Sequence, residues 1–100
     1  MEEINKHIEQ VKKLCDSNEV KSLFAFGSVL KNQLLPDSDI DLIVDIDDQD
    51  PLSYSDKYFD LKFNLEKIFG RKIDLLELKA IRNRFFKREI DRTKLQIYGE

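Results

Sequence analysis

Two short segments of this chain, FGS at residues 26–28 and DIDLIV at residues 39–44, carry most of the information about its fold. The first segment ends a continuous apolar run, which is typical of a strand that is covered on both faces. The second begins with Asp39 and Asp41, at the two-residue spacing that points both side chains to the same face of a strand. We therefore expect strands over residues 20–26 and 39–46, with a short helix over residues 28–33 between them.

The rest of the chain alternates between helical and extended patterns. Apolar residues recur every three or four positions in three segments, which predicts helices over residues 2–17, 53–69 and 79–91. A third strand is expected over residues 72–78, and residues 94–98 fit either a last strand or an extended tail. The inward-facing helical residues would be Ile4, Ile8, Val11, Leu14, Cys15, Tyr54, Tyr58, Leu61, Leu65, Ile68, Ile81 and Phe85, with Phe86 as a further candidate.

This order of elements predicts an α/β (α+β) fold, in which a small mixed sheet has helices packed mainly on one face. The other face would stay open, and we expect a functional site there. A length of 100 residues is common for one domain, so we expect a single domain over residues 1–100. The hydrophobic content of 41% is enough for a modest core.

The composition excludes several classes of protein. The longest apolar runs fall far short of the roughly 20 residues that cross a bilayer, so no membrane association is expected. The acidic start, Met1-Glu2-Glu3, does not resemble a secretory leader. Cys15 is the single cysteine and has no disulfide partner. We expect a cytoplasmic protein with a reduced thiol.

The net charge of −3 conceals an uneven distribution. Residues 37–50 hold seven aspartates and no Lys or Arg, whereas residues 71–94 hold nine basic and four acidic residues. One interpretation is that both segments are solvated surface. The other is a cation-binding acidic end, together with a basic tail that faces phosphate or an acidic partner.

Each of the three expected strands carries polar residues at one end or on one face. Gly27 and Ser28 follow the first strand, Asp39 and Asp41 lie in the second, and Asp74 interrupts the third. If the strands are neighbours, the three carboxylates can converge. Two like charges about 4 Å apart repel by about 4 kcal/mol at an effective dielectric of 20, so such a group needs a cation or hydrogen bonds.

Oxygen ligands without His or Cys nearby favour Mg²⁺ or Mn²⁺ over Zn²⁺. Two ions about 3.5–4 Å apart would stabilise both the attacking and the leaving oxygen of a phosphoryl displacement. The third carboxylate would then act as general base on an acceptor hydroxyl, or complete the coordination of one ion. Gly27 would let the backbone approach a triphosphate, and Ser28 would supply a hydroxyl and helix-start N–H groups for an anion.

The combined pattern resembles the signature of the nucleotidyltransferase superfamily with the polymerase-beta-like fold, and the resemblance covers nearly the whole chain. In size the chain is similar to the minimal nucleotidyltransferases (MNT), which are often encoded beside a HEPN-domain protein as its antitoxin. The resemblance implies metal binding by Asp39 and Asp41, a third acidic role for Asp74, and triphosphate contact by Gly27 and Ser28. It also implies transfer of AMP from ATP to a hydroxyl of the partner, a tyrosine of the HEPN toxin.

The chain departs from the common family form just after Ser28. Many relatives carry Arg-x-x-Gly there, whereas this chain has VLKN at residues 29–32. Lys31 is a candidate nucleotide-binding residue because it can replace the missing positive charge, and Asn32 can adopt positive φ. The departure leaves open a second hypothesis, that the chain neutralises its partner by contact alone. A third hypothesis is a transferase for a small acceptor.

Other residues have structural interpretations that we expect to hold. His7 should be packed or hydrogen-bonded, and Cys15 should be a small buried hydrophobe. Direct binding to nucleic acid is not expected. We expect three aromatic side chains to pack on the sheet, with stacking on a nucleotide base as the alternative: Tyr54, Tyr58 and Phe59. We expect four basic side chains to form a solvated helix face, with contact to nucleotide, RNA or a partner protein as the alternative: Arg82, Arg84, Lys87 and Arg88.

Overall fold

The computed structural model describes residues 2–27 and 38–99, so the predicted short helix over residues 28–33 lies outside the described residues. No helix within the described ranges is long and apolar enough to cross a membrane. The elements follow the order α1 (Glu2–Asn5), α2 (Ile8–Ser17), β1 (Val20–Phe26), β2 (Ile40–Ile46), α3 (Pro51–Phe69), β3 (Ile73–Glu77), the 3₁₀ turn η2 (Leu78–Ala80), α4 (Arg84–Thr93) and β4 (Leu95–Gly99).

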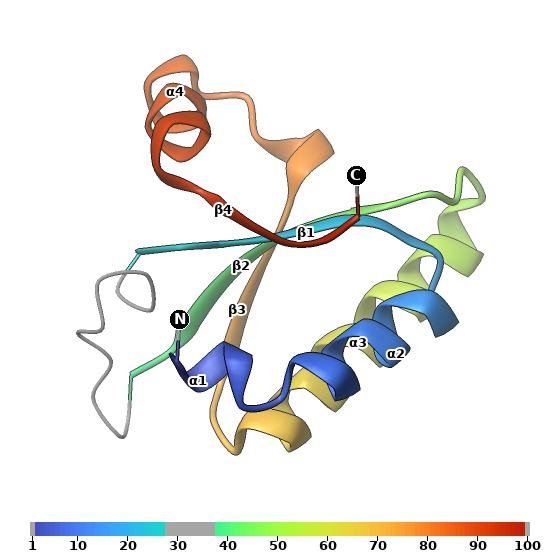
Figure 1. The fold of residues 1–100 in the computed structure, drawn as a ribbon. Helices are drawn as coiled ribbons and strands as arrows, with labels where there is room; N and C mark the ends of the chain where they lie inside the picture. The colour runs from blue at the N-terminus through green and yellow to red at the C-terminus, as the bar shows by residue number, and fades with distance from the viewer. Residues whose placement is uncertain (1, 28–37, 100) are drawn as a thin grey trace.

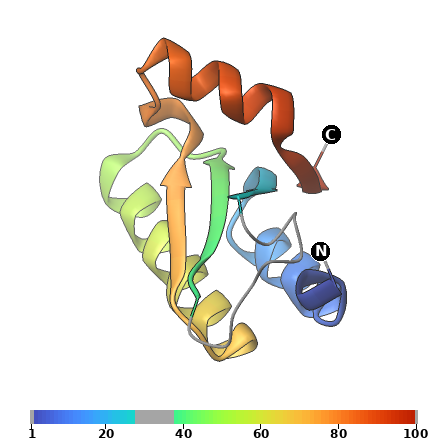
Figure 2. The same cartoon turned by 90° about the vertical axis from the view of Figure 1, so that its left-hand side faces the viewer.

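The four strands form one mixed sheet in the order β3-β2-β1-β4 (Figure 1). β1 is antiparallel to both β2 and β4, whereas β2 and β3 are parallel and are joined by the α3 crossover. Two helices, α2 and α3, cover one face, and α4 lies over the other, which we call the second face (Figures 1 and 2). The prediction of a small mixed sheet with helices mainly on one face is confirmed, but the expectation that the other face stays open is wrong, because α4 lies over it and its Phe86 packs against Phe26.

The pleat of β2 separates the two faces. Leu42 and Val44 are buried in the same core cluster as Leu61 and Leu65 of α3. Successive side chains of a strand point to opposite faces, so Asp41 projects to the second face. The same alternation in the neighbouring strands gives the second face its other members, Phe24, Phe26, Ile43, Asp74 and Leu76.

The predicted helix over residues 2–17 is two helices. The chain leaves helical geometry at His7, which has φ −119° and ψ 17° and is the N-cap residue of α2. Its imidazole lies edge-on to the ring of Phe69, with the ring centroids 5.3 Å apart. The predicted packing of His7 is therefore confirmed, and the contact occurs where α1 turns into α2.

The predicted helix over residues 79–91 begins later, at Arg84. The Asn83 side chain accepts hydrogen bonds from the backbone N–H groups of Phe85 and Phe86, which is an N-cap. This start leaves Phe85 82% exposed, so its predicted inward orientation is wrong. Ile90 is the buried residue of α4. The last segment is a strand rather than an extended tail, because β4 pairs with β1.

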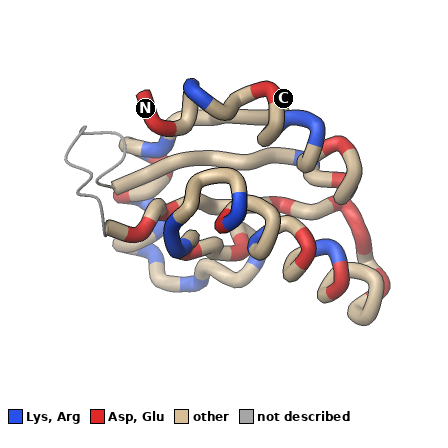
Figure 3. Tube along the Cα trace, turned by 90° about the horizontal axis from the view of Figure 1, so that it is seen from below, with Lys and Arg blue, Asp and Glu red and all other residues tan. Residues whose placement is uncertain are grey.

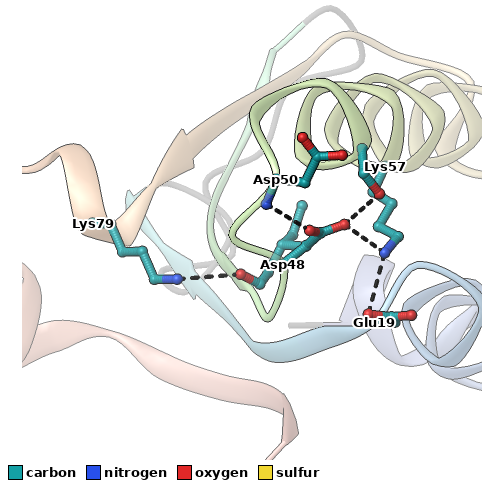
Figure 4. A network of polar contacts seen from close by, with 7 residues as sticks. Glu19, Asp48, Asp50, Lys57 and Lys79 are labelled. Atoms are coloured by element: carbon teal, nitrogen blue, oxygen red, sulfur yellow. Dashed lines mark hydrogen bonds and ion pairs between the residues drawn. The ribbon is translucent and has the colours of Figure 1, made fainter.

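An acidic turn connects β2 to α3, and its charges are partly paired (Figure 4). The Asp48 carboxylate accepts hydrogen bonds from the backbone N–H of Asp50, from the Ser53 hydroxyl and from Lys57 Nζ, the last at 2.7 Å. Lys57 also pairs with Glu19 at 3.2 Å, which ties the turn to the start of β1. These contacts, led by Lys57, lower the pKa of Asp48 to about 2.

Part of the aspartate run therefore has a structural role. Lys79 pairs with Asp45 at 3.4 Å and donates to the backbone carbonyl of Ile46 at 3.3 Å. Acidic and basic residues are interspersed along most of the trace (Figure 3). Two aspartates of the run, Asp45 near the end of β2 and Asp48 after it, are thus paired with lysines, whereas Asp39 and Asp41 lie before and at the start of β2.

The Asp48 contacts predict a specific pH dependence of folding. A carboxyl whose pKa is lowered in the folded state stabilises the fold above its unfolded pKa of about 3.9, and that contribution is lost as the pH falls towards 2. We expect Asp48→Asn to have a lower urea midpoint than the unchanged protein at pH 7, and the two midpoints to converge below pH 4. The control is Glu19→Gln, whose effect should be smaller because that side chain is 61% exposed. A midpoint difference that stays constant from pH 7 to pH 3 would contradict this account.

Candidate active site

Two aspartates from neighbouring strands lie side by side on the second face. Asp41 of β2 and Asp74 of β3 are register partners in the parallel ladder, and neighbouring strands lie about 4.8 Å apart. Burial and the neighbouring charge of Asp74 raise the pKa of Asp41.

Gly27 completes the site from the β1 side. It directly follows Phe26, the antiparallel partner of Asp41, and it has φ +77°. A Cβ atom at this position would lie 2.8 Å from Asp41 Oδ2. Glycine is therefore required here for two independent reasons, the left-handed backbone and the close approach of the Asp41 carboxylate.

Asp39 lies just before β2 and is exposed. Together these groups raise the pKa of Asp41: partial burial has the largest effect, followed by the charges of Asp74 and Asp39. No Lys or Arg of the described segments forms an ion pair with these three residues, in contrast to Asp45 and Asp48. We call Asp39, Asp41 and Asp74 the aspartate cluster.

The aspartate cluster has the donor chemistry of a site for a hard divalent cation. It offers only carboxylate oxygens, which suit Mg²⁺ or Mn²⁺. Within residues 2–27 and 38–99, however, no group of three or more His, Cys, Asp or Glu side chains has the arrangement of a metal-ion site. Asp41 and Asp74 are register partners on neighbouring strands, and the charge of Asp39 acts on Asp41. The arrangement is therefore an open acidic site whose charge a cation would neutralise.

The structure thus brings together four of the six predicted site residues, Asp39, Asp41, Asp74 and Gly27. Ser28 and Lys31 lie outside the described residues. The roles assigned to all six residues stay predictions.

A positioning contact that the sequence did not indicate comes from Arg71. Its Nη1 donates to the backbone carbonyl of Ser38 at 3.1 Å, so the residue before Asp39 is tied to the segment that leads into β3. In the sequence this arginine follows Gly70 among other charged residues. No local pattern distinguishes it from a solvated cation.

The remaining candidates from the sequence are largely structural. The Tyr58 hydroxyl donates to the Leu75 carbonyl at 2.6 Å, and Tyr54 packs against the core cluster. The expectation for Phe59 is wrong, since it is exposed and stacks on Phe63. Cys15 is fully buried, and burial raises the pKa of its thiol to about 12, which fits the predicted inert hydrophobe.

Three known proteins are similar to this chain over most of its length. A protein of Methanocaldococcus jannaschii named "Putative protein adenylyltransferase MJ1379" is 37% identical over 92 residues, which span 91% of each chain. The solved "Structure of putative minimal nucleotidyltransferase" has a TM-score of 0.78 at 24% identity, over 94% of this chain and 92% of that one. A solved complex of a tri-AMPylated Shewanella oneidensis HEPN toxin with its MNT antitoxin matches at a TM-score of 0.65 and 19% identity, over 96% and 72% of the two chains.

These structures confirm the predicted polymerase-beta-like fold. The family model described as "Polymerase beta, Nucleotidyltransferase" matches residues 9–100, which include the whole sheet and the aspartate cluster. The chain therefore belongs to the polymerase beta nucleotidyltransferase family.

Proposed function

We propose that this chain is a Mg²⁺-dependent protein adenylyltransferase that moves AMP from ATP to a hydroxyl of a partner protein. The observation that carries the proposal is the half-buried Asp41, which lies between Asp74 and Gly27 without a cationic partner among the described residues. A charged group in this environment is costly unless it serves a ligand. The name of the M. jannaschii relative supports the same activity.

The proposed reaction is a single displacement at phosphorus. The acceptor oxygen forms a bond to the α-phosphorus of ATP, the bond from that phosphorus to the bridging oxygen breaks, and pyrophosphate leaves with the electron pair. Asp74 accepts the hydroxyl proton, while Gly27, Ser28 and Lys31 bind the β- and γ-phosphates. Asp39 and Asp41, with Asp74, would hold Mg²⁺, which when bound supplies positive charge to the attacking and leaving oxygens.

Metal binding has a readout that does not depend on activity. A ligand present at 100 times its Kd stabilises the folded state by about 2.7 kcal/mol, and each kcal/mol is worth about 4–8 °C in a domain of this size. We expect saturating MgCl₂ to raise the melting temperature by about 10 °C or more, and to raise that of Asp41→Asn much less. Sodium chloride at equal ionic strength is the control. An equal rise in sodium chloride would mean that general screening, and not a bound cation, causes the effect.

We further propose that the acceptor protein is a HEPN-domain toxin that the transfer silences. The structure with a tri-AMPylated HEPN toxin and an MNT antitoxin supports this choice. The test is the intact mass of the HEPN protein encoded beside this chain's gene, after incubation with this chain, ATP and Mg²⁺. The expected result is a gain of one or more AMP units, with no gain when α,β-methylene-ATP replaces ATP. An unchanged mass in both reactions would refute the proposal.

The second candidate function is neutralisation of the partner by contact alone. It is favoured by VLKN at residues 29–32, where many family members carry an arginine. Replacing both Asp39 and Asp41 by asparagine separates the two functions. Contact alone should still protect cells from the partner after this change, whereas protection by AMP transfer should be lost.

A further inference from the structure

A small hollow lies on the second face beside the aspartate cluster. Its volume is about 270 Å³, and β3, η2 and the start of α4 enclose it. Leu76, at its floor, follows Asp74 by two residues on the same face of β3, a distance of about 6.6 Å along a strand. The lining is mainly apolar and consists of Leu76, Glu77, Ala80, Ile81, Arg82, Asn83 and Phe86.

The hollow lies further along β3 than Asp74, and one of its lining residues, Phe86, packs edge-on against Phe26, the register partner of Asp41. The strand order β3-β2-β1 puts Asp74 on the β3 side of Asp41 and Gly27 on the β1 side. In the displacement proposed above, the leaving and attacking oxygens must approach phosphorus from opposite directions. If pyrophosphate leaves near Gly27, the acceptor arrives from the side of β3, the strand whose last residues line the hollow.

Positive charge lies on the exposed part of α4, whose first residues follow the loop that lines the hollow, and one cation, Arg82, lines the hollow itself. In the second half of α4, Arg92 pairs with Glu89 and Lys94 pairs with Asp91. In the first half of α4 and the preceding loop, four cations are exposed and form no ion pair with any described residue. We call these four residues, Arg82, Arg84, Lys87 and Arg88, the basic surface. Phe85, 82% exposed, lies among them.

We propose that the basic surface and the hollow together dock an acidic segment of the acceptor protein, with one apolar side chain seated in the hollow. This inference rests on the proposed function, because the direction from which the acceptor protein approaches follows from the proposed displacement at phosphorus. The four cations supply charge complementarity to glutamate and aspartate, and the apolar lining supplies the anchor. Nucleic acid carries the same sign of charge but has no aliphatic side chain to fill the apolar hollow, so an acidic peptide with one apolar residue fits better.

Charge reversal tests the basic surface without touching the aspartate cluster. The variant is Arg84→Glu, Lys87→Glu and Arg88→Glu, and all three side chains are exposed. The matched control is Lys12→Glu, Lys13→Glu and Lys67→Glu, which makes the same charge change at exposed positions of α2 and α3, across the sheet. The probes are the HEPN protein and a short fluorescent peptide of glutamates around a single leucine, with a lysine version of the peptide and a short single-stranded RNA for comparison.

We expect the variant to bind the HEPN protein and the glutamate peptide about tenfold or more weakly, and the control to bind them as the unchanged protein does. Equal binding by variant and control would overturn the proposal, as would stronger binding of the RNA or of the lysine peptide. If the variant loses peptide binding, but neither the unchanged protein nor the control transfers AMP, the docking surface stands and the proposed function fails. If AMP transfer is unaffected in the variant, the function stands and the docking surface fails.

Substitutions at Ala80 test the role of the hollow separately, because Ala80 is an exposed residue that lines the hollow. Ala80→Leu fills the hollow from the solvent side, while Ala80→Ser keeps it open. We expect Ala80→Leu to lose the preference for leucine over serine at the centre of the peptide, and Ala80→Ser to keep it. Unchanged preference in a folded Ala80→Leu protein, with the circular dichroism spectrum of the unchanged chain, would remove the hollow from the proposal.

Discussion

Replacing Asp41 with asparagine should slow AMP transfer by about 100–1,000-fold and, at neutral pH, should stabilise the fold. The loss of activity is of the size found when one preorganised electrostatic group is removed from an active site. The gain in stability follows from the sign of the pKa shift. Asp41 has a raised pKa in the folded state, so the folded protein binds protons more readily than the unfolded chain, and stability falls as the pH rises above about 3.9.

The matched control is Asp45→Asn, on the same strand and the same face. Asp45 has a lysine partner, Lys79, so its replacement removes an ion pair and should not stabilise the protein. Urea denaturation from pH 4 to pH 8 should show the midpoint of Asp41→Asn rising above that of the unchanged protein with increasing pH. A lower midpoint for Asp41→Asn at pH 7 would show that its charge is already compensated, and would remove the main support for a cation site.

Gly27→Ala should damage both folding and activity. The positive φ alone costs a residue with a side chain about 1–2 kcal/mol, and the added Cβ atom would lie 2.8 Å from Asp41 Oδ2. The carboxylate must then move, and a displacement of about 1 Å in a catalytic arrangement can cost about 100-fold in rate. We expect an unfolding free energy lower by about 1–3 kcal/mol, and AMP transfer lower by about 100-fold.

Gly70→Ala separates the two causes. Gly70 also has positive φ, 65°, but a Cβ atom there would meet nothing within 4 Å. It should share the loss of stability, which urea denaturation measures, and keep the rate of transfer. Equal rates for Gly27→Ala and Gly70→Ala, both measured on folded protein, would show that the position of Asp41 is not critical.

The central part of the fold could be predicted because its local signals agree with its tertiary environment. β1, β2 and β3 are largely apolar runs, of which β1 ends at Gly27 and β2 lies between Asp39 and Asp47, and α3 combines a periodic stripe with a terminal glycine. The two-residue spacing of Asp39 and Asp41 placed Asp41 correctly in the strand, whereas Asp39 lies one residue before β2 begins. The position of Asp74 inside an apolar run indicated that it belongs to the same site.

The predictions that the structure overturns occur where a local interaction competes with the periodic spacing of apolar residues. The Asn83 cap starts α4 later than the apolar spacing indicated, and this turns Phe85 outward. The break at His7 lies inside a regular apolar stripe, which spacing alone does not reveal. The contact between Gly27 and Asp41 depends on the pairing of Phe26 with Asp41, and the strand register cannot be obtained from either segment alone.

The parallel pairing of β2 with β3 has a consequence for the order of events during synthesis. Asp41 and Asp74 become neighbours only after the entire α3 crossover has been made and has docked. Contacts between distant parts of a chain form slowly, because loop closure must come first. A nascent chain that still lacks β3 would have two of its acidic groups but no complete site, so catalytic competence should appear late on the ribosome.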